Sequence, residues 1–363
     1  MFNDLESKLQ SLLERNITSV LELENWLFDE LRVNAKIEEK ITSSLIATYR
    51  DTDNRNMRDL HMYNQNTIQP LLKRYNAKFD QKFIECPFSN LLDERKYEFM
   101  KKARFVKSKM FNEKNIALSI KGQECITKYR EIMSNITINW EGEQKTYAHV
   151  KAKLDNPNRA IRKKAWYALC EARSVVKPEV DRIMNEIIQL KKKIALNAGF
   201  NNYSEYAFKQ KNRDYSIDDC YKLHESIQKY VVPIWKQLGS ISKKNLDVKT
   251  YRPWDLSPCN IPKAPFQNAI NLCDGVVEER ENKAAGAICF TLPHSKEVFV
   301  YSNFSPSFHT INALIHEVGH AFHFYKQFKN DSSMQERYLR EEVAELYSLS
   351  LELLVMDKLN VFL

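Results

Sequence analysis

Glycine is scarce in this sequence, with 7 residues in a chain of 363. Sandwiches and barrels of β-strands need glycine at many tight turns, so this scarcity argues against an all-β fold. Residues with high helix propensity crowd long stretches instead, and the composition therefore predicts a mainly α protein. A chain of this length can form more than one compact region with a large core.

The sequence also lacks the features of an exported or membrane-spanning chain. Its start, MFNDLESKLQ, has no positively charged residues followed by an apolar run. No apolar stretch approaches the roughly 18 residues that span a bilayer. No C-x-x-C pair occurs, and we expect a protein of the reducing cytoplasm without a membrane partner. The cysteines are odd in number and widely scattered: Cys86, Cys125, Cys170, Cys220, Cys259, Cys273 and Cys289.

No strong excess of one charge is present. The 55 basic and 47 acidic residues give a formal net charge of +8. The densest basic run, Lys191 to Lys193, follows an apolar helix-like segment and is typical of the solvated face of a helix. A nucleic-acid-binding protein would more often gather its basic residues into a stripe with exposed aromatic residues, so we expect no nucleic-acid partner.

Apolar periodicity divides the chain into helical segments with polar joints. Helices are expected at 20–31, 37–49, 60–79, 159–172 and 180–198, and Pro70 is expected to kink or restart the third. Strand pairs are expected at 136–140 with 145–149 and at 287–292 with 298–304. The proline-rich segment 251–265 is the expected connector. We expect three regions: N-terminal helical 1–108, middle helical 109–205 and catalytic 206–363.

The segment INALIHEVGHAFHFY contains the arrangement H-E-x-x-H at His316, Glu317 and His320. Four residues of a helix turn through about 400°, so the two histidines lie one turn apart on one face and both imidazoles can reach one ion. Glu317 projects about 100° away, which suits a base acting on water at the metal better than a third ligand. The spacing therefore predicts a catalytic zinc helix with Glu317 as general base.

The surroundings of this motif favour a metal site over a chance pentapeptide in an ordinary helix. Four of the eight histidines lie between His309 and His323. His323 lies about one turn past His320, and we interpret it as a hydrogen-bond partner behind a ligand, with a ligand or a packed histidine as alternatives. Gly319 costs a helix about 1 kcal/mol, which is explained if a side chain there would crowd the metal or the substrate.

A catalytic zinc needs three protein ligands and one open position. A metzincin site would need glycine at position 323 and histidine at position 326, but the chain has His323 and Lys326. The remaining option is a carboxylate from a second helix, in the segment REEVAELYSLSLELL. Its spacing does not choose among Glu341, Glu342, Glu345 and Glu352.

These segments resemble the oligoendopeptidase F and thimet oligopeptidase family of zinc metallopeptidases. The family's active-site helix has the pattern HExGHAxH, and this chain has HEVGHAFH from His316 to His323. The next helix of the oligoendopeptidase F branch is similar to VAEVASTFNE, and VAELYSLSLE here implies that Glu345 is the third metal ligand. Further likeness lies in KAAGAICFTLPHSKEVFVYSNF, NAGFNNYSEYAFKQKNRDYS and YRPWD.

The resemblance implies a two-lobed helical metallopeptidase with a deep channel, a small β-hairpin beside the active-site helix, one Zn²⁺ per chain and short peptides as substrates. We expect the edge strand at 298–304 to hold the substrate by main-chain pairing. Family members continue beyond the position matching residue 363 and supply oxyanion-binding groups from there, so we expect an incomplete, catalytically weak enzyme. The alternatives are a hydrolase of non-peptide substrates and an inactive binding protein that retains the fold.

Overall fold

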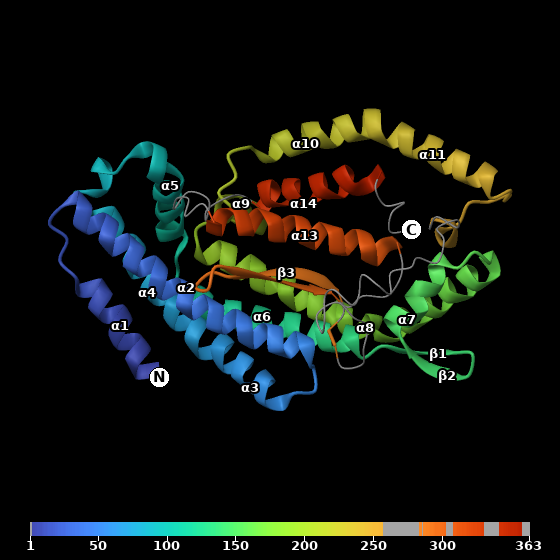
Figure 1. The fold of residues 1–363 in the computed structure, drawn as a ribbon, viewed down its shortest axis with the longest axis horizontal. Helices are drawn as coiled ribbons and strands as arrows, with labels where there is room; N and C mark the ends of the chain where they lie inside the picture. Colours follow the sequence, from blue (N-terminus) through green and yellow to red (C-terminus); the bar gives the residue numbers. More distant parts are fainter. Residues whose placement is uncertain (1, 257–282, 285, 303–307, 330–340, 358–363) are drawn as a thin grey trace. The chain divides into compact units, whose positions relative to one another are not determined.

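The computed structural model describes residues 2–256, 283–284, 286–302, 308–329 and 341–357 (Figure 1). These residues form mostly helices, and the strands that they contain make two separate antiparallel hairpins. The expected mainly helical fold with a small hairpin beside the histidine helix is therefore confirmed.

The chain divides into two compact units, each of which gathers segments that are distant in the sequence. The expected regions 1–108, 109–205 and 206–363 follow the order of the chain instead, and their boundaries remain a prediction. Unit 1 consists of Met1–Ser134, Pro178–Asn212 and Lys263–Leu363, and unit 2 consists of Asn135–Lys177 and Arg213–Pro262.

The N-terminal helices of unit 1 pack around aromatic side chains. Trp26 and Phe79 are fully buried with their rings edge to face, 5.8 Å apart, and the Trp26 indole donates to the Leu12 carbonyl at 2.9 Å. Ser19 and Asn54 cap two of the helices by accepting main-chain amides. These helices are α1 (Phe2–Glu14), α2 (Val20–Arg50), α3 (Arg55–Tyr63), α4 (Gln69–Glu85), α5 (Glu94–Met110) and α6 (Lys114–Ser134).

Two prolines follow π-helical turns. The π turn η1 (Asn64–Ile68) joins α3 to α4, and Pro70 lies in the first turn of α4. In unit 2, η4 (Ile227–Val231) joins α10 (Ile217–Ser226) to α11 (Val232–Asn245), which has Pro233 in its first turn. Proline has no amide hydrogen and its ring crowds the preceding turn, so a wider turn accommodates it. The expected restart at Pro70 is confirmed.

The hairpin of unit 1 is held by the N-terminal helices. It comprises β3 (Ala287–Leu292) and β4 (Glu297–Ser302), in the register Cys289 opposite Val300. The fully buried Tyr301 places its hydroxyl 2.9 Å from the Tyr49 carbonyl of α2 and 2.6 Å from the Ala284 carbonyl. Glu39, also on α2, accepts the amides of His294 and Ser295 in the hairpin turn. Helix α2 thus fixes the hairpin against which the histidine helix packs.

Unit 2 contains the other hairpin, β1 (Thr137–Trp140) with β2 (Glu143–Thr146). The expectation that its second strand continues to residue 149 is wrong, because Thr146 caps a helix, α7 (Tyr147–Ala152), by accepting the His149 amide. Helix α8 (Arg159–Asn197) starts in unit 2 and continues into unit 1. The expected helices at 159–172 and 180–198 are this single helix, with Pro178 inside it.

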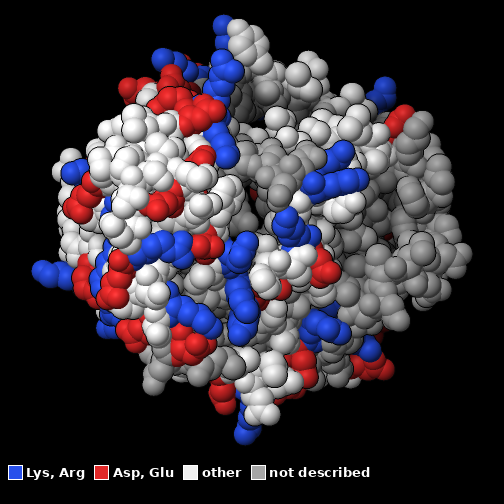
Figure 2. Space-filling view, turned by 60° about the vertical axis from the view of Figure 1, so that its left-hand side comes forward, with Lys and Arg blue, Asp and Glu red and all other residues white. Residues whose placement is uncertain are grey.

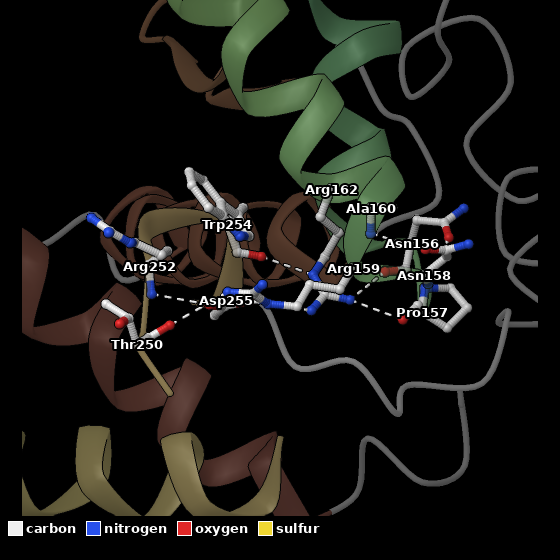
Figure 3. Close-up of polar contacts among 10 residues, drawn as sticks. All are labelled: Asn156, Pro157, Asn158, Arg159, Ala160, Arg162, Thr250, Arg252, Trp254 and Asp255. Atoms are coloured by element: carbon white, nitrogen blue, oxygen red, sulfur yellow. Dashed lines mark hydrogen bonds and ion pairs between the residues drawn. The ribbon is translucent and has the colours of Figure 1, made fainter. Parts of the chain in front are cut away.

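A buried ion-pair cluster joins the start of α8 to the segment before residue 256 (Figure 3). Arg162, only 1% exposed, donates from Nε to the Trp254 carbonyl and from Nη1 to the Asn156 carbonyl, each at 2.8 Å. The buried Asp255 carboxylate accepts two hydrogen bonds from Arg159, each at 2.8 Å. Only the first part of the expected connector at 251–265 lies within the described residues.

Charges of both signs are mixed on the face of the molecule that Figure 2 draws. On the face drawn in Figure 2, Lys and Arg side chains are interspersed with Asp and Glu side chains and do not form one stripe. Among the helices that the structure describes, none has the length and apolar character needed to cross a bilayer.

Candidate metal centre and active site

Helix α13 (Phe308–Lys329) presents the histidine motif. The His316 and His320 rings lie edge to face with their centroids 4.8 Å apart, as expected for side chains one turn apart on a helix. The helix packs against β3 and β4 on one side and against α14 (Glu341–Val355) on another. The structure therefore confirms that the two histidines share a face.

Gly319 allows α13 and α14 to approach closely. A Cβ atom at this position would lie 2.6 Å from the Ser348 Cα atom and 3.2 Å from the Tyr347 carbonyl oxygen. Ser348 is fully buried at this contact. The expectation that a side chain at Gly319 would crowd the metal or the substrate is wrong, because it would collide with the α14 backbone. The glycine thus sets how near the carboxylates of α14 come to the histidines.

Glu345 of α14 joins the two histidines. Its Oε2 atom lies 3.2 Å from His316 Nε2 and 3.6 Å from His320 Nε2. One ligand atom from each residue lies within 4.8 Å of the other two. Ligand atoms at about 2.0–2.1 Å from a tetrahedral zinc are roughly 3.3 Å apart, so the arrangement fits a shared ion of this kind.

Glu352 lies behind His316. Its Oε1 atom is 2.6 Å from His316 Nδ1, and its Oε2 atom accepts a hydrogen bond of 2.5 Å from Asn312. An ionised carboxylate only accepts, so His316 Nδ1 carries a proton and, in neutral imidazole, Nε2 has the lone pair. That lone pair would face the Glu345 carboxylate at 3.2 Å, an arrangement that is satisfied either by a proton on Nε2 or by a metal ion held between the two atoms.

Glu317 projects away from the ligands, toward the hairpin. Its carboxylate accepts a hydrogen bond from the Cys289 amide of β3. Burial raises the pKa of Glu317, and Glu345 adds to the rise, whereas His320, His316 and the Cys289 amide oppose it. A carboxyl group with a raised pKa holds a proton more readily, which suits a group that accepts and returns one.

The structure distinguishes the carboxylates that the sequence left open. Glu345 converges with the histidines, whereas Glu352 meets His316 at its far nitrogen, Nδ1. Glu342 is exposed, and the side chain of Glu341 lies outside the described residues. Glu352 is seven residues from Glu345, so both occupy one face of α14. That spacing could have identified Glu352 as a partner of a ligand.

His323 packs between Tyr347 and Gln327. It is 4% exposed, and its ring stacks on Tyr347 with the centroids 4.1 Å apart. Its Nε2 atom is 3.0 Å from Gln327 Nε2. None of these contacts involves a candidate ligand, so the expected role of His323 behind a ligand stays a prediction. His320 differs from His316, whose Nδ1 atom meets Glu352. The Nδ1 atom of His320 is buried and has no hydrogen-bond partner in the described part of the chain.

Comparisons with known proteins identify the family and the fold of the chain. The model of peptidase family M3 matches residues 152–274 and 267–363. No curated protein matches the sequence. A structure of PZ peptidase A with an inhibitor superposes with a TM-score of 0.91 at 18% identity, over 100% of this chain and 69% of that chain.

A Bacillus anthracis str. Ames protein assigned as an oligoendopeptidase F superposes with a TM-score of 0.90 at 20% identity, over 100% of this chain and 72% of its own. Another structure assigned as an oligoendopeptidase F has a TM-score of 0.89 at 20% identity and covers 97% of this chain and 67% of its own. These likenesses show a shared fold, and the solved chains are longer than this one. The family model spans more than half of the sequence, and the chain therefore belongs to peptidase family M3.

Proposed function

We propose that this chain is a zinc-dependent endopeptidase of short peptides, with His316, His320 and Glu345 as the metal ligands. The observation that carries the proposal is the approach of His316 Nε2 to Glu345 Oε2 at 3.2 Å while Glu352 engages Nδ1. Glu352 fixes the ring so that Nε2 is available to the ion. A zinc ion held there would supply Lewis acidity, polarising a peptide carbonyl and lowering the pKa of water.

Glu317 is the proposed proton carrier. Its carboxylate takes a proton from the attacking water and delivers it to the amine that leaves when the peptide bond breaks. The Cys289 amide holds the carboxylate, while burial in the wall formed by β3 and α13 keeps its proton affinity high. The chemistry needs one residue that orients the water and transfers its proton, and Glu317 fills this role through its hold on the Cys289 amide.

Strand β3 is the better candidate for main-chain pairing with a peptide than the expected strand at 298–304. The Cys289 amide points from β3 to Glu317, so this edge of the hairpin faces the reacting group. Backbone groups two residues apart in a strand point to the same side, which places those of Thr291 on that edge as well. A peptide lying there would be recognised by its backbone.

The test combines metal analysis with hydrolysis of a quenched peptide. We expect about one zinc per chain, lost in Glu345→Ala, together with cleavage that a chelator stops and zinc restores. Glu342→Ala is the matched control on the same helix, because Glu342 is exposed. Full zinc affinity in Glu345→Ala would remove Glu345 from the site. Metal binding without any peptide cleavage would favour the non-peptide hydrolase or the binding protein.

A further inference from the structure

Three leucines of α14 are exposed beside the proposed metal ligand. Leu346, Leu349 and Leu353, here called the leucine row, are 51–69% exposed. Within the core of the N-terminal helices, by contrast, Leu9 and Leu27 are fully buried. Single apolar side chains on a surface are common, but contiguous ones indicate a surface that contacts another molecule. The leucine row is therefore a candidate binding surface.

The spacing of the leucine row places it next to the ligand. Its members are three and four residues apart along α14, so the Cβ atoms of neighbours are about 5–6 Å apart. Leu349 follows Glu345 by four residues and precedes Glu352 by three, which places it between these two carboxylates on the surface of the helix. The row therefore begins beside the proposed ligand and continues past the residue that holds His316.

The ligand cluster is most accessible on the side that α14 forms. The Glu345 side chain is 53% exposed although its Oε2 atom lies 3.2 Å from His316 Nε2. The His316 and His320 side chains are less exposed, at 24% and 13%. A peptide that approaches the cluster from this side passes over Glu345 and the side chains next to it. The leucine row thus lies where a substrate would make contact.

The hairpin and α14 offer a peptide different kinds of contact. Helix α13 lies between them and contacts both (Figure 1). Strand β3, whose Cys289 amide meets Glu317, presents main-chain groups, and these recognise an extended peptide whatever its side chains are. Helix α14 presents apolar side chains, and the close contact between Gly319 and Ser348 holds it against α13. Discrimination among substrate side chains is therefore expected from α14.

We propose that the leucine row selects peptide substrates that carry an apolar side chain next to the scissile bond. The inference rests on the proposed peptidase function and specifies which peptides that site prefers. Consecutive Cα atoms of a peptide are about 3.8 Å apart, so the residues that flank a carbonyl at the ion lie within reach of Leu349, one helical turn from Glu345. Contact with the leucine row removes apolar surface of both partners from water, which favours binding.

The charges of α14 add a second criterion for the same position of the substrate. The 15 residues of the helix include four glutamates and no lysine or arginine. Glu342, one turn before Leu346, is exposed at the start of the leucine row. An acidic substrate side chain packed on the row would be repelled by Glu342 and would find no cationic side chain on α14. The expected order of preference is therefore apolar, then uncharged polar, then acidic.

Peptide titration tests this selection once the cleavage point of a host peptide is known. Mass spectrometry of the products made by the wild-type chain locates the cut, and each flanking residue is then replaced in turn by Leu, Ser or Glu. Calorimetry with zinc-loaded Glu317→Gln protein compares their binding without hydrolysis. At one flanking position, Leu should bind about 10-fold more tightly than Ser, and Glu more weakly than Ser. Leu349→Asn should remove most of the Leu preference.

Leu354→Asn is the matched control for Leu349→Asn. Leu354 is also an exposed leucine of α14. It lies nine residues from Glu345, which places it on the opposite side of the helix. The preference for Leu over Ser should therefore be unchanged in Leu354→Asn. Melting curves verify that both variants fold, which is expected because both leucines are exposed.

The outcomes separate this proposal from the function on which it rests. Cleavage of the host peptide with equal binding of the Leu, Ser and Glu peptides overturns selection by α14 and leaves the peptidase function standing. A Leu preference that persists when all three leucines of the row are replaced by Asn also overturns it. A wild-type dimer that dissociates in Leu349→Asn but not in Leu354→Asn would show that a second copy covers the row, which overturns it as well. Absence of cleavage refutes the peptidase function itself.

Discussion

Two clusters of charged side chains in this protein differ in how completely their groups are paired. In unit 2, the polar atoms of Arg162 and Asp255 that the structure describes meet carbonyls, a carboxylate or a guanidinium (Figure 3). In unit 1, His316 Nε2 faces Glu345 Oε2 at 3.2 Å while Glu352 holds Nδ1. Complete pairing is what a structural cluster requires, whereas the facing nitrogen and oxygen in unit 1 can take up a proton or a metal ion. The number of hydrogen-bond and ion-pair partners of each polar atom therefore distinguishes a structural cluster from a candidate site.

Removal of the proton carrier should give the largest effect. Glu317→Gln is expected to keep zinc and fold but to lose peptide hydrolysis by a factor on the order of 10² to 10⁴, because the amide cannot accept and return the proton. Single-turnover cleavage and zinc content measured on the same samples check this. Near-normal turnover with zinc bound would mean that another group activates the water.

Breaking the buried ion-pair cluster of Arg162 and Asp255 should lower the stability of the protein but leave metal binding unchanged. Arg162→Met leaves the buried Asp255 carboxylate with fewer partners and is expected to cost about 3 kcal/mol of unfolding free energy. Denaturant unfolding measures the loss, and zinc stoichiometry should stay the same. The control is Lys164→Met on the same helix, whose exposed pair with Glu141 spans 3.7 Å and should contribute less than about 1 kcal/mol. Loss of zinc in Arg162→Met would abolish the distinction between the clusters.

A methyl group between α13 and α14 should disturb stability and metal together. Gly319→Ala places a Cβ 2.6 Å from the Ser348 Cα atom, and backbone cannot move aside as a side chain can. Overpacking of this kind typically costs about 1–3 kcal/mol, and displacement of α14 should also weaken zinc binding. Gly122→Ala on α6 is the matched control, because nothing lies within 4 Å of its added Cβ. Equal unfolding free energy and equal zinc affinity in the two variants would contradict the close approach of α13 and α14.

The carboxylate behind His316 should contribute less than the ligands. Glu352→Gln keeps the size of the side chain but weakens its hold on the Nδ1 proton, and it is expected to lower zinc affinity by about 10- to 100-fold. Competition with a fluorescent chelator measures the change, with Glu345→Ala as the reference for loss of a ligand. A Glu352→Gln protein that lost all its zinc would suggest that Glu352 is itself a ligand.

The contribution of Asp255 to the stability of the ion-pair cluster should decrease gradually as the pH falls. Burial opposes ionisation of Asp255, but hydrogen bonds from Arg159 and the Arg252 amide prevail and hold its pKa below the usual value. An acid with a depressed folded-state pKa stabilises the protein above about pH 3.8 and loses that contribution as pH falls through the folded-state pKa. The stability gap between wild type and Asp255→Asn should therefore shrink below pH 3.8. A gap independent of pH would show that the charge of Asp255 is not what stabilises the cluster.

The sequence by itself determined the helical class and the pairing of His316 with His320, because helical periodicity fixes which side chains share a face. Spacing alone left four carboxylates open, because the angle and distance between two helices are not encoded in spacing along either one, and only the family resemblance pointed to Glu345. The tertiary structure selected Glu345 through the contact that Gly319 permits, and it placed Glu352 behind His316. The contact of the Cys289 amide with Glu317 also emerged only there, since it joins a strand to a helix whose packing the sequence pattern does not encode.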